Sequence, residues 1–178
     1  MASVFTHAAV AAAITFAARP VGNPWRFYAV AAFCAVAPDL DVVGFQFGVE
    51  YGDMLGHRGL SHSLVAAATL GAIFTWAMFR GEVWTAAERT RALVVLALCT
   101  ASHGALDALT NGGMGIAFFA PLENSRYFFP WRPIQVSPIG IAAFFSQWGL
   151  AVLRSEIVVV WLPCAGACGL LALLRRRG

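Results

Sequence analysis

Lysine is absent from the sequence, and charged residues of any kind are few. The 178 residues include 12 arginines and 9 acidic residues, so charged residues make up 12% of the chain, about half the share usual in a soluble domain. Hydrophobic residues make up 60%, and the mean hydropathy is +0.72. These values exclude an ordinary soluble domain and predict an integral membrane protein surrounded by the lipid bilayer. The formal net charge of +3 is too small and too dispersed along the chain to indicate a nucleic-acid partner.

Signals for export, disulfide bonding and repeats are also lacking. Residues 1–20 carry neither the positive first region nor the clear cleavage site of a secretory signal, so we expect a helix of the mature protein. The cysteines all lie in apolar runs, where a thiol usually behaves as a small hydrophobe; they are Cys34, Cys99, Cys164 and Cys168. They predict neither a disulfide framework nor a redox site. We expect a single membrane-embedded domain over residues 1–178.

Apolar segments predict an all-α, polytopic bundle of about five membrane-embedded helices. They cover residues 4–18, 27–37, 60–79, 91–109 and 156–174, and only the third and fifth reach the roughly 20 residues of a full span. Within the long region that follows the fourth segment, 139–150 is expected to be interfacial or re-entrant. The domain then divides into a ligand-bearing core, 5–110, an aromatic and basic segment that faces substrate, 111–155, and a final transmembrane helix, 156–174.

Helices that cross the bilayer in alternate directions would bring the histidines and several aspartates to one face. We call the side where the chain begins side A. The first four segments each place polar residues there, and these residues are His7, Asp39, Asp41, His57, His62, His103 and Asp107. Ionisable residues at membrane depth normally face a protein interior or a wet cavity. The sequence therefore predicts one polar cluster at side A.

The distribution of arginines predicts the orientation of the chain. Eight arginines fall at the opposite side, side B, and these are Arg19, Arg26, Arg80, Arg89, Arg91, Arg175, Arg176 and Arg177. Side A has four, which are Arg58, Arg126, Arg132 and Arg154. The positive-inside rule makes side B cytoplasmic. We therefore expect the N-terminus outside and the C-terminus inside, with the cluster open to the periplasm or exterior.

The spacing of the cluster residues suits metal ligands. His103 and Asp107 are four residues apart, so on a helix their side chains lie one turn apart on the same face. Asp39 and Asp41 alternate after Pro38, which we expect to end the second segment, and a turn there would present both carboxylates together.

The stretch HRGLSHS places two histidines where one continuous helix cannot align them. Five residues correspond to about 500° of helical rotation, so His57 and His62 would lie on different faces. We expect His57 in the loop before the third segment, Ser61 as the helix cap, and His62 in the first turn. Both imidazoles would then reach the same pocket.

Histidine and aspartate without thiolate favour zinc, with manganese or iron as other choices. The seven candidate ligands exceed one four-coordinate ion, so the sequence predicts one or two ions. A pair of ions would polarise a phosphoryl oxygen, generate hydroxide near neutral pH and stabilise the leaving oxygen. We expect the catalytic residues to be Asp39, Asp41, His57, His62, His103 and Asp107, with one of the first two carboxylates alternatively serving as general base.

An aromatic and basic run, RYFFPWRP, suits an amphiphile with an anionic head. The guanidinium groups of Arg126 and Arg132, together with that of Arg58, match the geometry of phosphate oxygens. Tyr127 and Trp131 flank them at interfacial depth. These five residues are the predicted contacts to a lipid-like phosphorylated substrate.

The motifs in this order resemble a known family. A histidine in the first helix, PDLD, HRGLSHS, SHGALDALT and RYFFPWRPI are similar to the YdjM-like family of bacterial inner-membrane, predicted metal-dependent hydrolases, over about residues 5 to 140. More loosely, the order of His, Asp, His and HxxxD is similar to the zinc-dependent phospholipase C fold. The first resemblance implies a metal-dependent hydrolase of the inner membrane, and its residues map onto the same seven ligands.

Other classes of function stay open at this point. A transporter or channel for protons or divalent cations would need polar residues that continue to side B, and residues 4–18, 60–79 and 156–174 offer almost none. A haem- or quinone-binding protein would use paired histidines as axial ligands and would be coloured when purified. The short helices are also compatible with a homo-oligomer.

Overall fold

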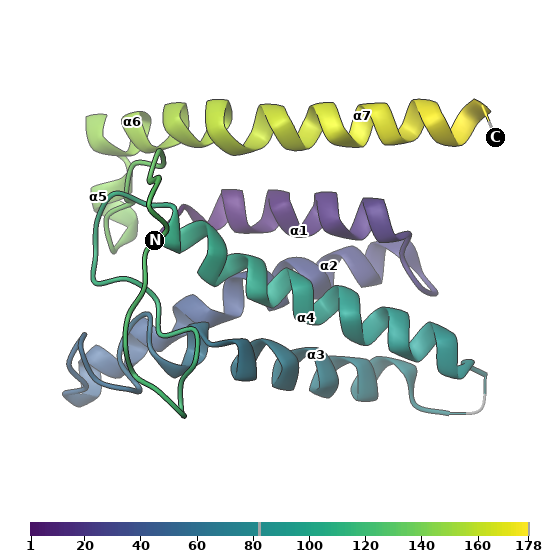
Figure 1. The fold of residues 1–178 in the computed structure, drawn as a ribbon, viewed down its shortest axis with the longest axis horizontal. Coiled ribbons are helices and arrows are strands. Elements are labelled where there is room, and N and C mark those ends of the chain that lie inside the picture. Colours follow the sequence, from purple (N-terminus) through teal and green to yellow (C-terminus); the bar gives the residue numbers. More distant parts are fainter. Residues whose placement is uncertain (82, 178) are drawn as a thin grey trace.

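The computed structural model describes residues 1–81 and 83–177, and the regular elements in these ranges are all helical. The main helices run along the long axis of the molecule in alternate directions (Figure 1). They are α1 (Val4–Ala18), α2 (Pro24–Val36), α3 (Leu64–Phe79), α4 (Ala86–Ala108), and α6 (Gln147–Glu156) joined to α7 (Leu162–Arg177) by the π-helical turn η3 (Ile157–Trp161). The expected all-α bundle is confirmed.

Helix length separates two groups of membrane segments. Three stretches are long and apolar enough to cross a membrane: Pro24–Phe47 with 24 residues, Ala86–Ala108 with 23, and Gln147–Arg177 with 31. The helices α1 and α3 are shorter, with 15 and 16 residues. At 1.5 Å per residue each extends only about 23 Å, less than the ~30 Å hydrocarbon core. The expectation that residues 60–79 form a full-length span is therefore wrong.

The third segment is shortened because a different serine caps its helix. Residues Leu60–His62 form a separate 3₁₀ turn, η2, which ends before α3 begins. The Ser63 hydroxyl accepts a hydrogen bond from the backbone N–H of Ala66 at 3.0 Å, so Ser63 is the cap that starts α3. The cap expected at Ser61 is wrong, and the Ser61 side chain is free to turn toward the histidines.

The second segment continues past the proline that was expected to end it. A 3₁₀ helix, η1 (Ala37–Phe47), follows α2 directly, and Pro38 lies at its start, where the missing N–H needs no partner. Runs of 3₁₀ helix longer than three or four residues are uncommon. This extension carries Asp39 and Asp41 away from the end of α2 and toward the loop that contains His57.

Capping residues also extend the fourth and fifth helices toward their N-termini. Thr85 and Glu88 form a reciprocal capping box, so α4 begins at Ala86 instead of near residue 91. The Ser146 side chain caps α6, which begins at Gln147. Residues 139–150 contain the short α5 (Ile141–Phe144) and the first turn of α6, and their location at the membrane interface stays a prediction.

A hydrophobic core fills the side-B half of the bundle. Its buried side chains come from α1 to α4 and include Phe27, Phe79, Val95 and Leu96. Helices α3 and α4 approach closely at Gly71, where an added β-carbon would lie 2.8 Å from the backbone nitrogen of Ala97. This packing fixes the relative positions of the four helix ends at side A.

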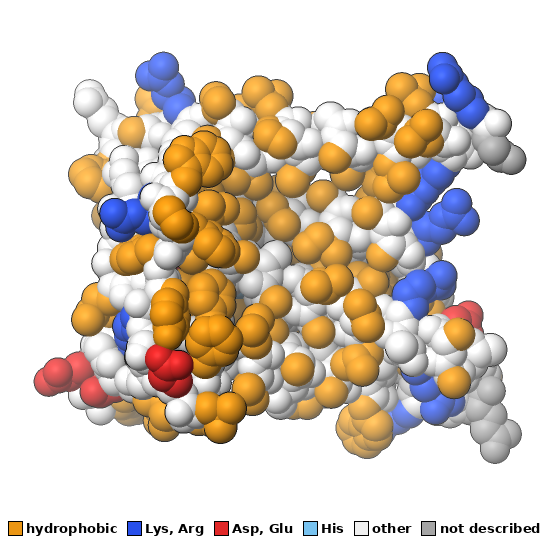
Figure 2. Space-filling model, in the orientation of Figure 1, with side chains coloured by type: hydrophobic (Ala, Val, Ile, Leu, Met, Phe, Trp, Pro, Cys, Tyr) orange, Lys and Arg blue, Asp and Glu red, His pale blue; other side chains and the backbone are white. Residues whose placement is uncertain are grey.

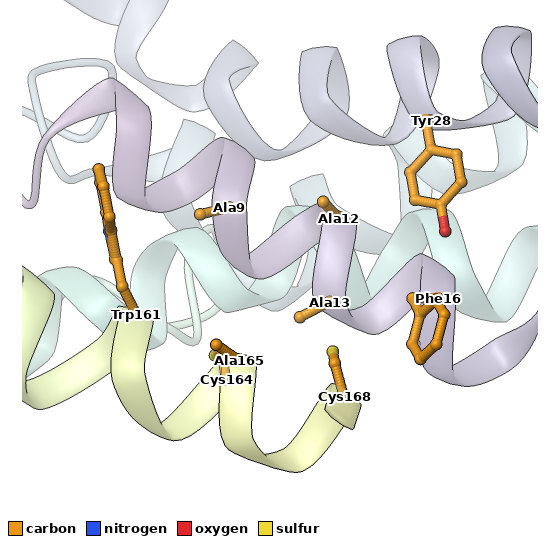
Figure 3. Close-up of a pocket in the computed structure, with 9 residues that line it drawn as sticks. All are labelled: Ala9, Ala12, Ala13, Phe16, Tyr28, Trp161, Cys164, Ala165 and Cys168. Carbon is orange, nitrogen blue, oxygen red and sulfur yellow. The ribbon is translucent and has the colours of Figure 1, made fainter. Parts of the chain in front are cut away.

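The last helix packs loosely on the others. None of the residues Leu162–Arg177 is buried. Three side chains from Glu156 onward make hydrogen bonds to the segment that begins with the α1 cap. Glu156 accepts from the Ser3 hydroxyl at 2.6 Å, the Trp161 indole donates to the Thr6 hydroxyl at 2.7 Å, and the Arg175 guanidinium donates to the Phe16 carbonyl at 2.9 Å. An apolar groove of about 420 Å³ lies between α1 and α7, where small residues of both helices line it together with Phe16, Tyr28 and Trp161 (Figure 3).

Charge and hydrophobicity divide the surface as expected for a membrane bundle. Apolar side chains cover the flank of the molecule, and basic side chains gather at the end where the C-terminus lies (Figure 2). The C-terminal ends of α1, α3 and α7 and the N-terminal ends of α2 and α4 meet at this end (Figure 1). Side B of the sequence is thus one physical end of the bundle.

Candidate metal centre

Four buried side chains meet at the other end of the bundle. Asp39 comes from η1, His62 from η2, and His103 and Asp107 from consecutive turns of α4. Each offers a nitrogen or oxygen atom, and these four atoms all lie within 4.8 Å of one another. Three helical elements that are distant in sequence therefore supply one set of metal-type ligand atoms.

The distances within this set match those of a tetrahedral site. The Nε2 atoms of His62 and His103 are 3.0 Å apart, and the Asp39 Oδ1 atom lies 3.3 Å from His103 Nε2 and 3.7 Å from His62 Nε2. Two ligands bound tetrahedrally at 2.0–2.1 Å from zinc would be separated by about 3.3 Å. The spacing of the donor atoms fits an ion between them.

Hydrogen bonds fix the orientation of three imidazole rings. The Nδ1 atom of His103 lies 2.7 Å from the Ala35 carbonyl, and Nδ1 of His57 lies 2.7 Å from Asp41 Oδ1. Because a carbonyl or carboxylate oxygen only accepts, each Nδ1 carries the proton and each Nε2 presents a lone pair. Metal-binding histidines usually donate their second N–H in this way. Nε2 of His57 has no partner among the described residues, and Nε2 of His103 faces Nε2 of His62.

Asp41 and Ser61 support the ring of His62. The Ser61 hydroxyl donates to Asp41 Oδ2 at 2.5 Å and lies 2.9 Å from His62 Nδ1, which is itself 3.2 Å from the same carboxylate oxygen. Asp41, His57 and His62 also form a second group whose ligand atoms lie within 4.8 Å of one another. The predicted residues of HRGLSHS and PDLD therefore lie together, as the spacing indicated.

His7 completes the convergence from α1. Its ring stacks on that of His103 with centroids 3.7 Å apart and an interplanar angle of 10°. Its Nε2 atom lies 3.5 Å from Asp107 Oδ1, and neither ring nitrogen has a hydrogen-bond partner among the described residues. All seven predicted ligands are thus brought to side A, while their roles as ligands or catalysts stay predictions.

Several buried polar atoms of the cluster are left without hydrogen-bond partners. They are both nitrogens of His7, both carboxylate oxygens of Asp39, Nε2 of His57 and Oδ2 of Asp107. Leaving a buried donor or acceptor unpaired costs about 1–3 kcal/mol, and more when the group is charged. A cation bound among Asp39, His62, His103 and Asp107 would satisfy the unpaired carboxylate oxygens of Asp39 and Asp107, so this donor set fits a metal ion.

The electrostatic field of the site favours positive charge. Burial by itself lowers the pKa of His62, but the hydrogen bonds to the carboxylates of Asp39 and Asp41 outweigh it and raise the pKa to about 9. The carboxylates around His62 therefore stabilise a positive charge, as a site for a divalent cation must.

The guanidinium of Arg58 lies inside the protein and not on its rim. Arg58 is fully buried, with a backbone φ of 67°. Its Nε lies 3.3 Å from Asp107 Oδ2, and its terminal nitrogens donate to the Gly112 carbonyl at 2.8 Å and to the Thr110 hydroxyl at 3.1 Å. The expected contact with a substrate phosphate is therefore replaced by a clamp on the Asp107 carboxylate.

Arg126 is also committed to the protein. It donates to the carbonyls of His57 at 2.8 Å and Asp53 at 2.9 Å, and so holds the loop that presents the first histidine of HRGLSHS. Arg126 is only partly buried, so its expected contact with substrate stays a prediction beside this loop contact. The other predicted substrate residues line the surface: Tyr127 donates to Glu123 at 2.7 Å, Arg132 stacks over Phe128 at 4.7 Å, and Trp131 is 68% exposed.

Two residues outside the predicted set, Ala2 and Glu156, position the start of α1. The backbone N–H of Ala2 donates to Asp107 Oδ1 at 2.5 Å, and Glu156 of α6 is fully buried, where it accepts from both the backbone and the hydroxyl of Ser3. Glu156 could have been singled out as the one acid in the otherwise apolar last span. Its contact explains how α6 and α1 meet beside the cluster.

We predict that Arg58→Met strongly destabilises the protein. The substitution leaves the buried Asp107 carboxylate without its guanidinium, and breaking a buried ion pair costs about 3–5 kcal/mol. The thermal unfolding midpoint of protein purified in detergent and treated with a chelator should fall. Arg132→Met, which removes an exposed arginine, is the control and should stay within about 0.5 kcal/mol of the unmodified protein. Equal midpoints for the two variants would show that the clamp contributes no stability.

Comparison with known proteins agrees with the motifs. The model of the YdjM inner membrane protein family matches residues 1–177. The chain is 36% identical over 176 residues to inner membrane protein YbcI of Escherichia coli (strain K12), and the alignment covers 99% of this chain and 100% of that protein. No solved structure matches it. A chain with this match over its length, apolar membrane-type helices and a His/Asp cluster at one end belongs to the YdjM inner membrane protein family.

Proposed function

We propose that the protein is a metal-dependent hydrolase that cleaves a phosphoester bond in a lipid or lipid-like substrate. One observation carries the proposal: imidazole and carboxylate groups are gathered in the protein interior, and both oxygens of Asp39, one oxygen of Asp107 and Nε2 of His57 have no hydrogen-bond partner among the described residues. Structural polar groups in a membrane bundle would pair with one another, because an unpaired group is costly. A gathered and unpaired set indicates a binding site.

Asp39, His62, His103 and Asp107 are the proposed ligands of the principal ion. Their nitrogen and oxygen atoms suit zinc, and manganese or iron would also accept them. Asp41 would act mainly by orienting His57 and His62, since both its oxygens already accept hydrogen bonds. A second ion would be served by His57, whose Nε2 is unpaired and which shares the second group of ligand atoms with Asp41 and His62. His7 would act beside the principal ion, because its Nε2 lies 3.5 Å from Asp107 Oδ1.

The protein groups around the ion would divide the work of hydrolysis. A divalent ion held there would lower the pKa of bound water and polarise a phosphoryl oxygen. Asp39, which would bind the ion through Oδ1, is also the proposed general base through Oδ2, because both its oxygens are unpaired and it is 9% exposed, whereas Asp107 and His103 are fully buried. Arg58 would hold Asp107 in place, and Arg132 with Trp131 would meet the anionic head at the surface.

The packing of the other half of the bundle does not favour a transporter. Buried apolar side chains such as Phe27, Phe79 and Leu96 fill the space between α1, α2, α3 and α4 on the way to side B. A proton or cation leaving the cluster in that direction would meet a hydrophobic core. Hydrolysis of a substrate that enters from side A needs no such path.

The proposed orientation follows from the arginines. Side B, which carries eight of them, would face the cytoplasm, and the metal centre would lie at the periplasmic side of the inner membrane. The substrate head would then be presented in the outer leaflet of that membrane.

Replacing His103 by Ala should remove both metal and activity. The variant loses a central ligand, so purified protein should contain no stoichiometric metal and should hydrolyse phospholipids and polyprenyl phosphates no faster than chelated protein. Elemental analysis and a hydrolysis screen measure the two effects. Ser102→Ala is the matched control, because the Ser102 hydroxyl donates only to the Cys99 carbonyl of its own helix. Activity retained in the His103 variant, with a monodisperse elution profile, would overturn the mechanism.

Asp41→Asn should weaken metal binding without abolishing it. A carboxylate that orients ligand histidines typically contributes about 10–100-fold to metal affinity. Competition of the purified protein with a fluorescent zinc chelator measures the change. Asp53→Asn, which alters an exposed carboxylate of the neighbouring loop, should leave the affinity unchanged. A loss of metal as complete as in the His103 variant would instead make Asp41 a ligand.

The orientation can be tested with reporters fused after the last residue. Green fluorescent protein, which folds in the cytoplasm, should fluoresce in a bacterial host, and alkaline phosphatase, which needs the periplasm, should be inactive. The opposite pair of results would place the metal centre on the cytoplasmic face.

A further inference from the structure

A second cavity adjoins the metal centre. It has a volume of about 500 Å³, within the range of small-molecule sites, and lies between the start of α1, the η1 helix and the segment before α6. We infer that it binds a single hydrocarbon chain of an amphiphile whose anionic head lies at the metal centre. This inference rests on the proposed function, because it names the part of the substrate that the metal ligands do not contact.

The cavity and the ligands share neighbouring residues. Val42, which lines the cavity, directly follows Asp41 in η1. Met1 also lines it, and the Met1 nitrogen lies 3.9 Å from Asp107 Oδ2. Ala2, between the lining residues Met1 and Ser3, donates its backbone N–H to Asp107. The cavity therefore borders residues that are in direct contact with the cluster.

The walls of the cavity combine a few polar groups with a large apolar surface. The Ser137 N–H donates to the Met1 carbonyl at 2.9 Å, so backbone polar groups lie beside Met1, the lining residue that contacts Asp107. The lining also includes the apolar side chains of Val4, Phe5, Phe144 and Phe145, and the rings of Phe5 and Phe144 lie 6.0 Å apart. An amphiphile likewise combines a polar head with an apolar chain.

Charge complementarity and the position of the cavity both favour an amphiphile with an anionic head. Asp107, which Met1 contacts from the edge of the cavity, belongs to the ligand set that suits a cation, and a bound cation attracts an anionic head group. Phe5 is 52% exposed and Phe145 is 79% exposed, so the apolar part opens on the lipid-facing flank, where hydrocarbon chains are always present. The groove between α1 and α7 differs, because it extends past Phe16 and Cys168 toward side B (Figure 3).

The test uses dodecylphosphonate with a photoreactive diazirine at the end of its chain, added to metal-loaded protein in detergent. After irradiation, mass spectrometry should find the label on peptides that contain Val4–Phe5 and Phe144–Phe145. Val4→Trp fills the cavity and should reduce this labelling at least about tenfold, with metal content unchanged. If the Val4→Trp variant does not insert into membranes, Val42→Trp fills the cavity in its place. Ala165→Trp, which fills the groove between α1 and α7, is the matched control and should label like the unmodified protein.

Activity with dodecyl phosphate and ethyl phosphate separates this inference from the proposed function. Filling the cavity should reduce kcat/KM for dodecyl phosphate at least about tenfold and leave ethyl phosphate unaffected. Labelling as expected without hydrolysis of either ester would support the cavity and contradict the hydrolase. Hydrolysis with no dependence on chain length, together with equal labelling of the filled and control variants, would overturn the cavity and leave the hydrolase standing.

Discussion

The contact between Asp107 and Arg58 is the interaction on which the side-A end of the bundle depends. Both side chains are fully buried, and an isolated charge in that position would be too costly to keep. The same carboxylate accepts the Ala2 N–H and lies beside His7, so α1, α4 and the HRGLSHS loop meet at one anion. Because this anion is held by a cation from the loop, its remaining lone pairs can face the cluster.

The convergence of the cluster could be predicted from sequence because it depends only on the alternating directions of the membrane spans. Spans that alternate across a bilayer bring the start of the first helix and the end of the second to the same side, whatever their exact lengths. Even with wrong boundaries for residues 60–79 and 156–174, His7, Asp39, His62 and His103 were therefore assigned to one end. The His103–Asp107 pair was the clearest case, since helical periodicity alone determines it.

The parts that could not be predicted depend on local hydrogen bonds. Which of Ser61 and Ser63 caps α3 is decided by an N–H three residues away, and the choice turns the other serine toward Asp41. The Arg58 side chain points inward because its backbone is left-handed, a conformation that the sequence HRGLSHS does not predict. The sequence therefore suggests a phosphate as the partner of Arg58, whereas its partner in the structure is the Asp107 carboxylate. The membership of the family was correctly predicted, because it depends on the order of motifs.

The loose packing of α7 has a consequence for how this helix keeps its register. Because no side chain of α7 is buried, its alignment with α1 depends chiefly on the polar contacts of Glu156 and Trp161, which precede it, and of Arg175 near its end. Replacing one apolar residue by another between these contacts should not change the alignment, since lipid tails solvate one aliphatic side chain as well as another. A slip of one helical turn would instead break all three contacts at once, so the last span has a single register despite its smooth surface.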